Sequence, residues 1–432
     1  MSAEARPDPA AAFIGPGAWR HGLSYGLLGL PLAFVALPLY VILPNHYARN
    51  FAAPLAALGA VLLAARLVDA VLDPIIGRWC DRLAARSRRT LLGVAGLNAI
   101  VLVLGLWGLL FPPAGVVAAG TTALLAWAGV LMAIAYTAYS VVAVGHQAWG
   151  ARLGGTEVQR SRVVAWREAL SLIGVLVAAV LPTAAGLGAT VVTFAVLLAL
   201  GWWAWTRSIA PIDQRVAQIG PGASPLRQGP FLRLLAVFVI NGTASAVPAT
   251  LQASPSIEPA FLATYFLSAA LSIPLWLRLV PRFGLARTWL IGMLLAVVTF
   301  VWAATLGEGD IVAFLVVCAL SGIALGTDLT LPGAMLSGLI GQLGERGQRE
   351  GAYFGWWSFA GKFNLALAAG LALPLLAWFG YEPGARDPEA LRTLTIAYCL
   401  LPCALKLAAA AALHLLVIRG PQPAALRPAT HP

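Results

Sequence analysis

The sequence predicts an all-α membrane protein with twelve transmembrane helices in two bundles of six. Three observations lead to this prediction: an apolar composition, a series of apolar windows and an alternating distribution of positive charge. Of the 432 residues, 60% are hydrophobic and only 10% are charged, and the mean hydropathy is +0.84. Soluble globular proteins carry about 25% charged residues because they must cover themselves with polar surface. The composition therefore excludes a soluble enzyme, a disordered protein and, in spite of the net charge of +11, a nucleic-acid-binding protein.

The apolar windows supply the predicted crossings. A helix needs about 20 mostly apolar residues to cross the hydrocarbon core of a bilayer. Two of the connections between windows are short and uncharged, PPAGVVAAG at 112–120 and AAGLG at 184–188. The predicted crossings lie at residues 22–43, 52–77, 90–111, 119–145, 163–186, 189–206, 231–252, 260–280, 287–306, 311–340, 352–379 and 391–418.

Positive charge orients these crossings. We assign 21 of the 28 lysine and arginine residues to one side of the membrane, and only Arg49, Arg386 and Arg392 to the other. Cytoplasmic loops carry the excess of positive charge in membrane proteins. Both termini and the even-numbered connections are therefore predicted to be cytoplasmic, in a multi-pass protein of a plasma or bacterial inner membrane. The remaining four, Arg66, Arg167, Lys362 and Lys406, fall inside predicted crossings.

A connection rich in proline, glycine and serine divides the chain into halves. We predict a cytoplasmic tail at 1–20, a first bundle at 21–207, a linker at 208–229, a second bundle at 230–418 and a tail at 419–432. The segments 66–82 and 271–287 share a proline and two arginines at an offset of 200 residues. Such a weak internal repeat is consistent with the parallel repeat of a transporter built from two halves.

The second predicted crossing carries three charged residues, Arg66, Asp69 and Asp73. Their spacing of three and four residues places them on one face of a helix. Charged residues inside a membrane are costly and usually mark a functional site. Carboxylates on one face suit a coupling cation or a proton, although mutual neutralisation of the three charges is the alternative. The four cysteines lie in apolar or boundary sequence without the spacing of metal ligands, so neither a metal site nor a disulfide framework is expected.

Three segments carry a resemblance to a known family. They are SYGLLGLPLAF at 24–34, DAVLDPIIGRWCDR at 69–82 and ERGQREGAYFGWWSFAGKFNLALAAGL at 345–371. Together they resemble the glycoside–pentoside–hexuronide:cation symporters, the melibiose-carrier-like branch of the major facilitator superfamily. The resemblance implies the major facilitator fold and alternating access to a central site, coupled to sodium or protons.

The resemblance also implies roles for single residues. Asp69 and Asp73 match the cation-site aspartates of the family, Lys362 matches its lysine in the eleventh crossing, and Arg167 roughly matches an arginine of the fifth. The chain departs from the sugar carriers in the first crossing, where it has Ala33, and in the fourth, which has no acid. These departures argue against a galactoside and favour a proton over sodium, while transport without coupling stays open.

Further polar residues of the crossings are candidate substrate contacts. His146 and Gln147 either bind substrate or form a packing hydrogen bond, and Tyr25 is a candidate in the first crossing. Arg167 either contacts substrate or pairs with Asp69 or Asp73; its neighbour Glu168 is expected to point elsewhere. Asp328 either binds substrate or pairs with Lys362, and Asn241 lies near a glycine and a proline, as binding-site residues of transporters often do. Lys406 is expected to pair or to extend toward the interface. Trp357 either stacks on a sugar ring or packs in the core.

A cytoplasmic gate is the last predicted site. Arg66, Asp81 and Arg82 are its candidate residues, because the charged run from Arg78 to Arg89 resembles the superfamily's gate between the second and third crossings. Simple orientation by positive charge is the alternative reading of that run.

The sequence thus predicts a secondary active transporter. Its expected partners are a small glycoside-like or anionic sugar solute, a coupling cation and the lipid bilayer, and we expect a monomer without a cofactor. The alternative is a lysophospholipid or other amphiphile carrier of the same fold. A membrane-embedded enzyme is not expected, because no catalytic motif is evident on the crossings.

Overall fold

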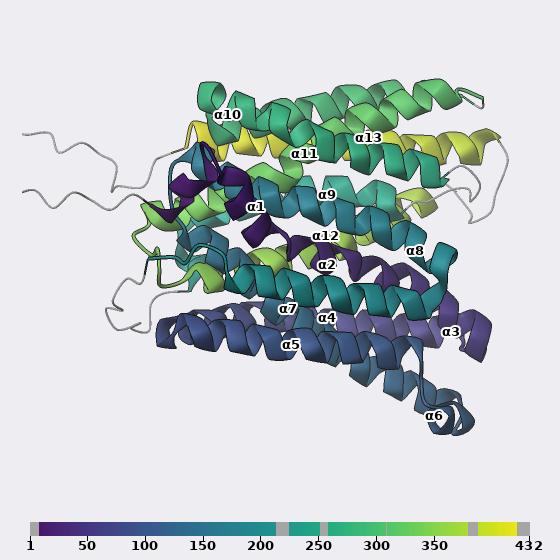
Figure 1. Cartoon of the computed structure of the whole chain (residues 1–432). Coiled ribbons are helices and arrows are strands. Elements are labelled where there is room, and N and C mark those ends of the chain that lie inside the picture. Colours follow the sequence, from purple (N-terminus) through teal and green to yellow (C-terminus); the bar gives the residue numbers. More distant parts are fainter. Residues whose placement is uncertain (1–7, 213–223, 251–257, 308, 379–387, 421–432) are drawn as a thin grey trace, which may run out of the picture. The chain divides into compact units, whose positions relative to one another are not determined.

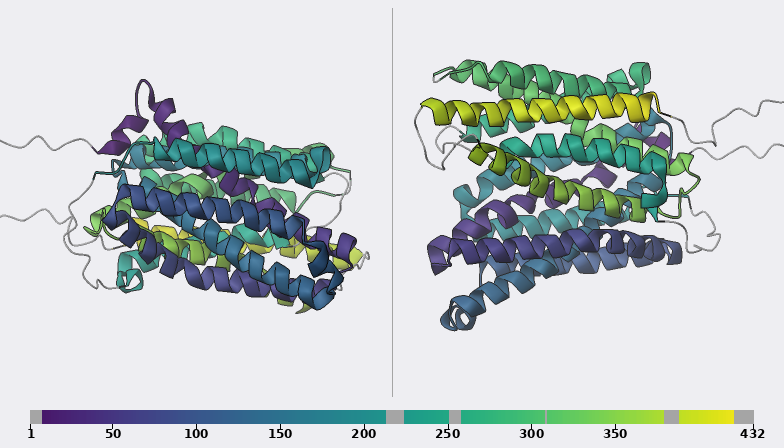
Figure 2. Two further views of the ribbon diagram at one scale, coloured as in Figure 1. Left: turned by 60° about the horizontal axis from the view of Figure 1, so that its bottom comes forward. Right: turned by 180° about the vertical axis from the view of Figure 1, so that it is seen from behind.

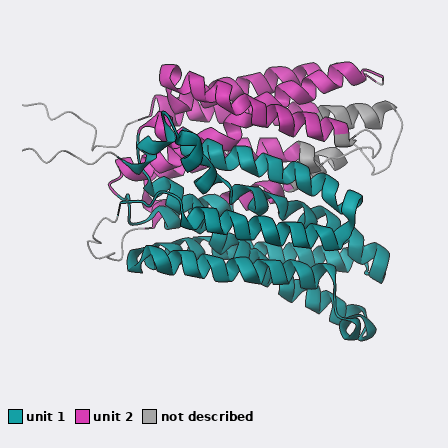
Figure 3. Cartoon of the chain, in the orientation of Figure 1, with its two compact units in different colours: residues 1–155, 162–220, 345–359 teal, residues 156–161, 221–344, 360–432 magenta. Residues whose placement is uncertain are grey.

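A computed structural model describes residues 8–212, 224–250, 258–307, 309–378 and 388–420, and the regular elements of these residues are all helices (Figure 1). Parts of the predicted tails, residues 1–7 and 421–432, lie outside the described residues, as do residues 213–223 of the predicted linker. The described chain divides into two compact units, each with its own internal contacts (Figure 3). Unit 1 holds residues 1–155, 162–220 and 345–359, and unit 2 holds residues 156–161, 221–344 and 360–432.

Unit 1 contains the elements of the first half of the chain, apart from the first residues of α8, and the first turns of α12. In this unit α7 packs against both α4 and α5, so that α4 and α5 are held by the same neighbour (Figures 1 and 2). The elements are η1 (Pro9–Phe13), α1 (Ala18–Gly26), α2 (Gly29–Phe34), η2 (Pro38–Ile42), α3 (Leu43–Phe51), α4 (Leu55–Arg86), α5 (Arg88–Leu110), α6 (Ala114–Ala118), α7 (Thr121–Arg152) and α8 (Glu157–Thr206).

Unit 2 contains the elements of the second half. Its most extensive pairing is between α10 and α11, and α13 packs against both α9 and α10 (Figure 2). The elements are η3 (Pro225–Arg227), α9 (Gly229–Thr250), α10 (Glu258–Ala303), α11 (Ile311–Gln342), α12 (Glu350–Trp378), α13 (Pro388–Ala412) and η4 (Leu413–Ile418). Helix α12 begins in unit 1 and continues in unit 2.

Two long helices are interrupted where the sequence predicts connections. Gly186 in α8 has φ 82° and ψ 172°, and Gly284 in α10 has φ 75° and ψ 170°. These left-handed values are available to glycine without steric cost, because it has no Cβ atom. Each helix therefore consists of two segments, which meet between predicted crossings five and six in α8 and eight and nine in α10.

Among the described residues, eight helical stretches are long and apolar enough to cross a membrane. They are Ala18–Phe51, Arg88–Leu110, Thr121–Arg152, Glu157–Thr206, Gly229–Val247, Ala260–Ala303, Ile311–Gln342 and Cys399–Ile418. The apolar, all-helical character predicted for the chain is confirmed for the described residues, whereas the count of twelve crossings and the cytoplasmic termini stay predictions.

Candidate functional site

The predicted acidic face of α4 points into unit 1. Asp69 and Asp73 are 1% and 0% exposed, and the Ser140 hydroxyl of α7 donates a hydrogen bond of 2.9 Å to Asp69 Oδ1. On the other side of α4, Val71 and Ile75 are 62% and 51% exposed. The helix therefore turns apolar side chains outward and carboxylates inward, as a membrane helix beside a polar site does.

Arg66 stands on the same face, about one turn before Asp69. Its guanidinium carbon lies 4.1 Å from the ring centroid of Tyr40 and 5.8 Å from that of Tyr136. An arginine over an aromatic face is attracted by the negative face of the ring. The two tyrosines thus fix a positive charge close to the two aspartates of α4.

Close backbone contacts bury the C-terminal part of this acidic face. A Cβ atom on Gly351 would lie 2.2 Å from the carbonyl oxygen of Gly77, and one on Gly355 would lie 2.5 Å from that of Asp73. Both distances are shorter than real Cβ contacts, so α4 and the start of α12 approach through small residues. Small residues permit this close packing between membrane helices.

The predicted gate residue Asp81 joins α4 to the beginning of α12. Its carboxylate accepts hydrogen bonds from the backbone N–H groups of Gly351 and Ala352, at 2.7 and 2.8 Å. Arg152 Nη2 lies 2.6 Å from Asp81 Oδ1, and Arg152 Nε lies 3.2 Å from Glu350 Oε2. A carboxylate at a helix N-terminus satisfies amide groups and the positive end of the helix dipole.

Asp81 lies beyond the predicted crossing 52–77. Burial raises the pKa of its carboxyl to about 7, although the positive charge of Arg152 acts to lower that pKa. The other two predicted gate residues are not part of this cluster: Arg82 is exposed, and Arg66 packs on Tyr40. Arg152 and Glu350 were not among the predicted site residues. Arg152 entered the sequence analysis only through the total of positive charges, because nothing in its local pattern identifies its partner.

His146 and Tyr25 bind each other's backbone. The Tyr25 hydroxyl donates to the His146 carbonyl oxygen at 3.1 Å, and His146 Nε2 lies 2.8 Å from the Tyr25 carbonyl oxygen. The two rings are stacked at 4.3 Å, and both residues are buried. The structure therefore contains the packing contact that was one of the two readings of His146. Gln147 beside it is half-buried.

The expected separation of Arg167 and Glu168 is wrong. These neighbours in α8 form an ion pair, in which Arg167 Nη2 contacts Glu168 Oε1. Long side chains of adjacent residues can bend toward each other, although their Cβ atoms diverge around the helix. Arg167 thus has a compensating charge within its own helix.

Unit 2 contains a second buried polar group, which we call the Asp328 cluster: Asp328, Lys406, Asn241, Trp289 and Ser245. Lys406 Nζ donates to Asp328 Oδ2 at 2.5 Å and to Asn241 Oδ1 at 2.8 Å. Trp289 Nε1 and Asn241 Nδ2 donate to Asp328 Oδ1 at 2.8 and 3.0 Å. Ser245 Oγ donates to Asp328 Oδ2 at 3.3 Å. One lysine, one carboxylate and three neutral groups therefore form a connected network across α9, α10, α11 and α13.

This network shows Lys406 as a partner of Asp328, where the sequence analysis weighed Lys362 for that place. Lys406 was expected to pair or to extend toward the interface, and it pairs. Lys362 is half-buried in unit 2, and Trp357 is buried in unit 1. Within the described residues, no three His, Cys, Asp or Glu side chains converge as metal ligands.

Comparisons with known proteins agree with a transporter fold. A family model described as MFS/sugar transport protein matches residues 24–419. No curated protein sequence matches the chain significantly.

Two solved structures are similar over nearly their whole length. The human organic anion transporter MFSD10 (TETRAN) has a TM-score of 0.66 at 15% identity, covering 92% of this chain and 100% of that one. A bacterial homologue of the iron transporter ferroportin, in an outward-facing state, has a TM-score of 0.64 at 16% identity, covering 91% and 98%. At these identities the likeness shows a shared fold.

Proposed function

Because this chain belongs to the MFS/sugar transport protein family, we propose that it carries a glycoside-like or anionic sugar solute together with a proton or sodium ion by alternating access. The family and fold make it a multi-pass membrane transporter rather than an enzyme, and such transporters need no cofactor. The solute, the coupling ion and the monomeric state belong to the proposal, as do the melibiose-carrier-like branch, the two-bundle boundaries and the cytoplasmic termini.

The observation that carries cation coupling is the buried acidic face of α4. Asp69 and Asp73 are almost fully buried, and Arg66 lies on the same face of their helix. A buried carboxylate is costly in an apolar interior, and a proton or cation bound at Asp69 or Asp73 neutralises that charge. We propose that this neutralisation permits the loaded transporter to switch between its outward-facing and inward-facing states.

A proton is the favoured coupling ion. Sodium needs several oxygen ligands, whereas a proton needs one carboxylate with a suitable environment. The hydroxyl of Ser140 bonds to Asp69 from α7, a helix without any Asp or Glu residue. The acid that the sugar carriers add from this helix is thus replaced by neutral groups, which lowers the number of charged oxygen ligands.

Asp81 supports the alternating-access part of the proposal. Its bonds to Arg152 and to the first amides of α12 fasten the end of α4 to another helix. We propose that this cluster holds one facing state, and that its bonds break when the cytoplasmic side opens.

Thermal unfolding of detergent-purified protein with a ligand panel tests the function. The panel holds methyl glucoside, glucuronate, glucosamine and lysophosphatidylcholine, each with and without sodium and at two pH values. A ligand at 100 times its dissociation constant stabilises a protein by about 2.7 kcal/mol, which is measurable. We expect a shift with a water-soluble sugar or uronide, and we expect its size to depend on pH more than on sodium.

The double variant Asp69→Asn, Asp73→Asn tests the coupling site. It should keep the ligand shift but lose its pH or sodium dependence, whereas Asp310→Asn, at an exposed position before α11, should retain both. In proteoliposomes, uptake of the identified ligand should no longer follow an ion gradient in the double variant. Fully coupled uptake by that variant would overturn the assignment of Asp69 and Asp73.

The missing acids of the sugar carriers favour an amphiphile carrier as the second candidate. Residue 33 is alanine, and α7 carries no acid that would bind sugar hydroxyls. A thermal shift with lysophosphatidylcholine alone, absent with a matched concentration of a non-lipid detergent, would support this candidate against the first.

A further inference from the structure

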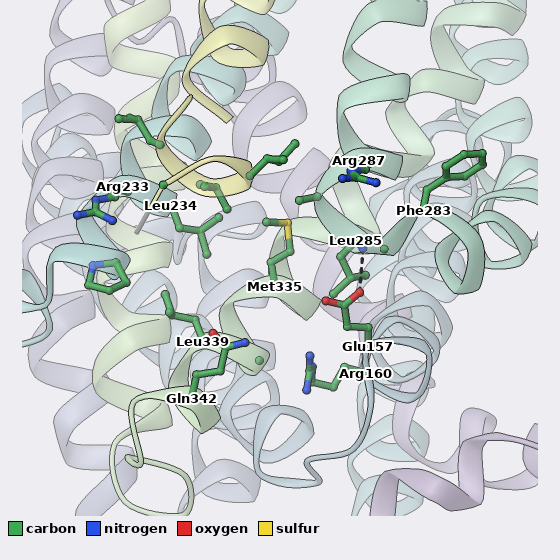
Figure 4. A pocket seen from close by; sticks show the side chains of 18 residues that line it. Glu157, Arg160, Arg233, Leu234, Phe283, Leu285, Arg287, Met335, Leu339 and Gln342 are labelled. Carbon is green, nitrogen blue, oxygen red and sulfur yellow. Dashed lines mark hydrogen bonds between the residues drawn. The ribbon is translucent and has the colours of Figure 1, made fainter. Parts of the chain in front are cut away.

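A pocket in unit 2 is lined by residues other than those of the buried acidic face and the Asp328 cluster. Its volume is about 330 Å3, and three arginines line it, Arg160, Arg233 and Arg287 (Figure 4). Of these, Arg160 and Arg233 are half-buried and Arg287 is exposed. The proposed transport function uses none of them.

The elements around the pocket all end on the side that the positive-charge distribution predicts to be cytoplasmic. The lining comes from the starts of α8 and α9, the break of α10 at Gly284, the last turns of α11 and η4. With the predicted orientation, these helix ends place the pocket at the boundary between the cytoplasm and the lipid headgroups. An arginine there is within reach of the cytoplasmic leaflet.

The charge of the pocket is positive. Three guanidinium groups line it with one carboxylate, Glu157, and Glu157 Oε2 already accepts a hydrogen bond of 3.1 Å from the backbone N–H of Leu285 (Figure 4). Gly338 of α11 makes room for Arg160, since a Cβ atom there would lie 2.5 Å from Arg160 Nη2. The sequence thus combines a glycine with an arginine to bring positive charge against the wall of the pocket.

Apart from Gln342, the rest of the lining is apolar. Phe283, Met335, Leu339 and Leu416 contribute side chains, and Phe283 and Leu416 are 44% and 40% exposed. A free phosphorylated solute gains little from such a surface. A lipid gains from both parts, because its phosphate meets the arginines and its glycerol and acyl carbons cover apolar side chains.

We propose that this pocket binds the phosphate headgroup of an anionic lipid from the cytoplasmic leaflet. Guanidinium groups recognise phosphate through paired, charge-assisted hydrogen bonds. Basic pockets between membrane helices on the cytoplasmic side are suited to such headgroups. The bound lipid connects the starts of α8 and α9 to the break in α10, and so stabilises unit 2.

The test uses delipidated full-length protein titrated with phosphatidylglycerol, phosphatidylcholine or free glycerol phosphate, followed by native mass spectrometry and thermal unfolding. We expect phosphatidylglycerol to bind and to raise the unfolding temperature, with little effect of the other two. In the double variant Arg233→Gln, Arg287→Gln the apparent affinity for phosphatidylglycerol should fall on the order of tenfold. The matched double variant Arg278→Gln, Arg282→Gln removes the same charge outside the pocket and should bind as the unaltered protein does.

Equal weakening in both double variants would show general attraction to a basic surface and overturn the proposal. Binding of free glycerol phosphate as tight as that of phosphatidylglycerol would overturn the lipid assignment. An arginine-directed reagent tests the unaltered protein, so the result does not depend on folding of the variants. Phosphatidylglycerol should slow modification of Arg233 and Arg287 but not of Arg278 and Arg282, and equal rates with and without lipid would contradict the proposal.

Discussion

Removing the two charges of the Asp328 cluster one at a time should destabilise the protein unequally. Lys406 and Asp328 have side chains that are 8% and 12% exposed, so each charge is largely shielded from water. Breaking a buried ion pair by removing one partner costs about 3–5 kcal/mol, because it leaves a buried charge without compensation. The groups that remain around the surviving charge decide where in that range each variant falls.

In Lys406→Met, the carboxylate of Asp328 keeps three neutral donors, Trp289, Asn241 and Ser245. In Asp328→Leu, the ammonium group of Lys406 keeps Asn241 Oδ1 from this cluster. We therefore expect a loss in unfolding free energy of about 3 kcal/mol for Lys406→Met and about 5 kcal/mol for Asp328→Leu. The double variant leaves no buried charge in the cluster, and its loss should be below about 2 kcal/mol, because apolar replacements of similar volume are often tolerated.

Unfolding by sodium dodecyl sulfate in mixed micelles, followed by tryptophan fluorescence, measures the four free energies of this double-mutant cycle. A positive coupling energy confirms that the two residues interact in the folded state. Additive losses, or a larger loss for Lys406→Met than for Asp328→Leu, would refute the reasoning from the number of remaining partners. The single variant Asp328→Asn serves as a control. It removes the negative charge but keeps an amide oxygen that accepts a hydrogen bond from the ammonium group of Lys406.

Two further predictions concern the contact between α4 and the start of α12. Gly351→Ala should lower the unfolding temperature, because its Cβ atom would lie 2.2 Å from the Gly77 carbonyl oxygen, whereas Gly361→Ala, with its nearest neighbour atom at 3.8 Å, should not lower it. Equal changes in the unfolding temperature of both variants in a thermal scan would contradict this prediction. Arg152→Gln removes the cation between two carboxylates and should cost about 3–5 kcal/mol in unfolding free energy. The exposed Arg82→Gln should cost under about 0.5 kcal/mol in the same denaturant titration, and equal costs would argue against the cluster.

The local sequence pattern predicts many of the helices and their buried faces. The apolar windows follow from runs of neighbouring residues, and the common face of Asp69 and Asp73, opposite the exposed Val71 and Ile75, follows from a helical period of 3.6 residues. The predicted connection AAGLG likewise contains Gly186, whose backbone interrupts α8. Short-range signals of this kind identify elements and their buried faces without knowledge of the tertiary structure.

Such local signals do not predict which charged residues pair when they are far apart in the sequence. Lys406 is 78 residues from Asp328, and Arg152 is 71 residues from Asp81. Which arginine meets which carboxylate depends on the depth and rotation of whole helices, and several alternatives satisfy the same charge balance. For this reason the candidate partner that the sequence suggested for Asp328 was Lys362. Arg167 and Glu168 show the same limit at short range, because side-chain rotamers rather than Cβ directions decide their contact.

The acidic face of α4 and the Asp328 cluster differ in how their carboxylates are bonded, and this difference bears on cation coupling. In unit 2, a cation that approaches Asp328 competes with an ammonium group already bonded to its carboxylate at 2.5 Å. In unit 1, the buried carboxylates of Asp69 and Asp73 lie on one face of α4, and Arg66 on that face packs over the ring of Tyr40. A further cation at Asp328 would therefore have to displace Lys406. We therefore propose that a coupling ion binds in unit 1, and that the Asp328 cluster holds four helices of unit 2 together.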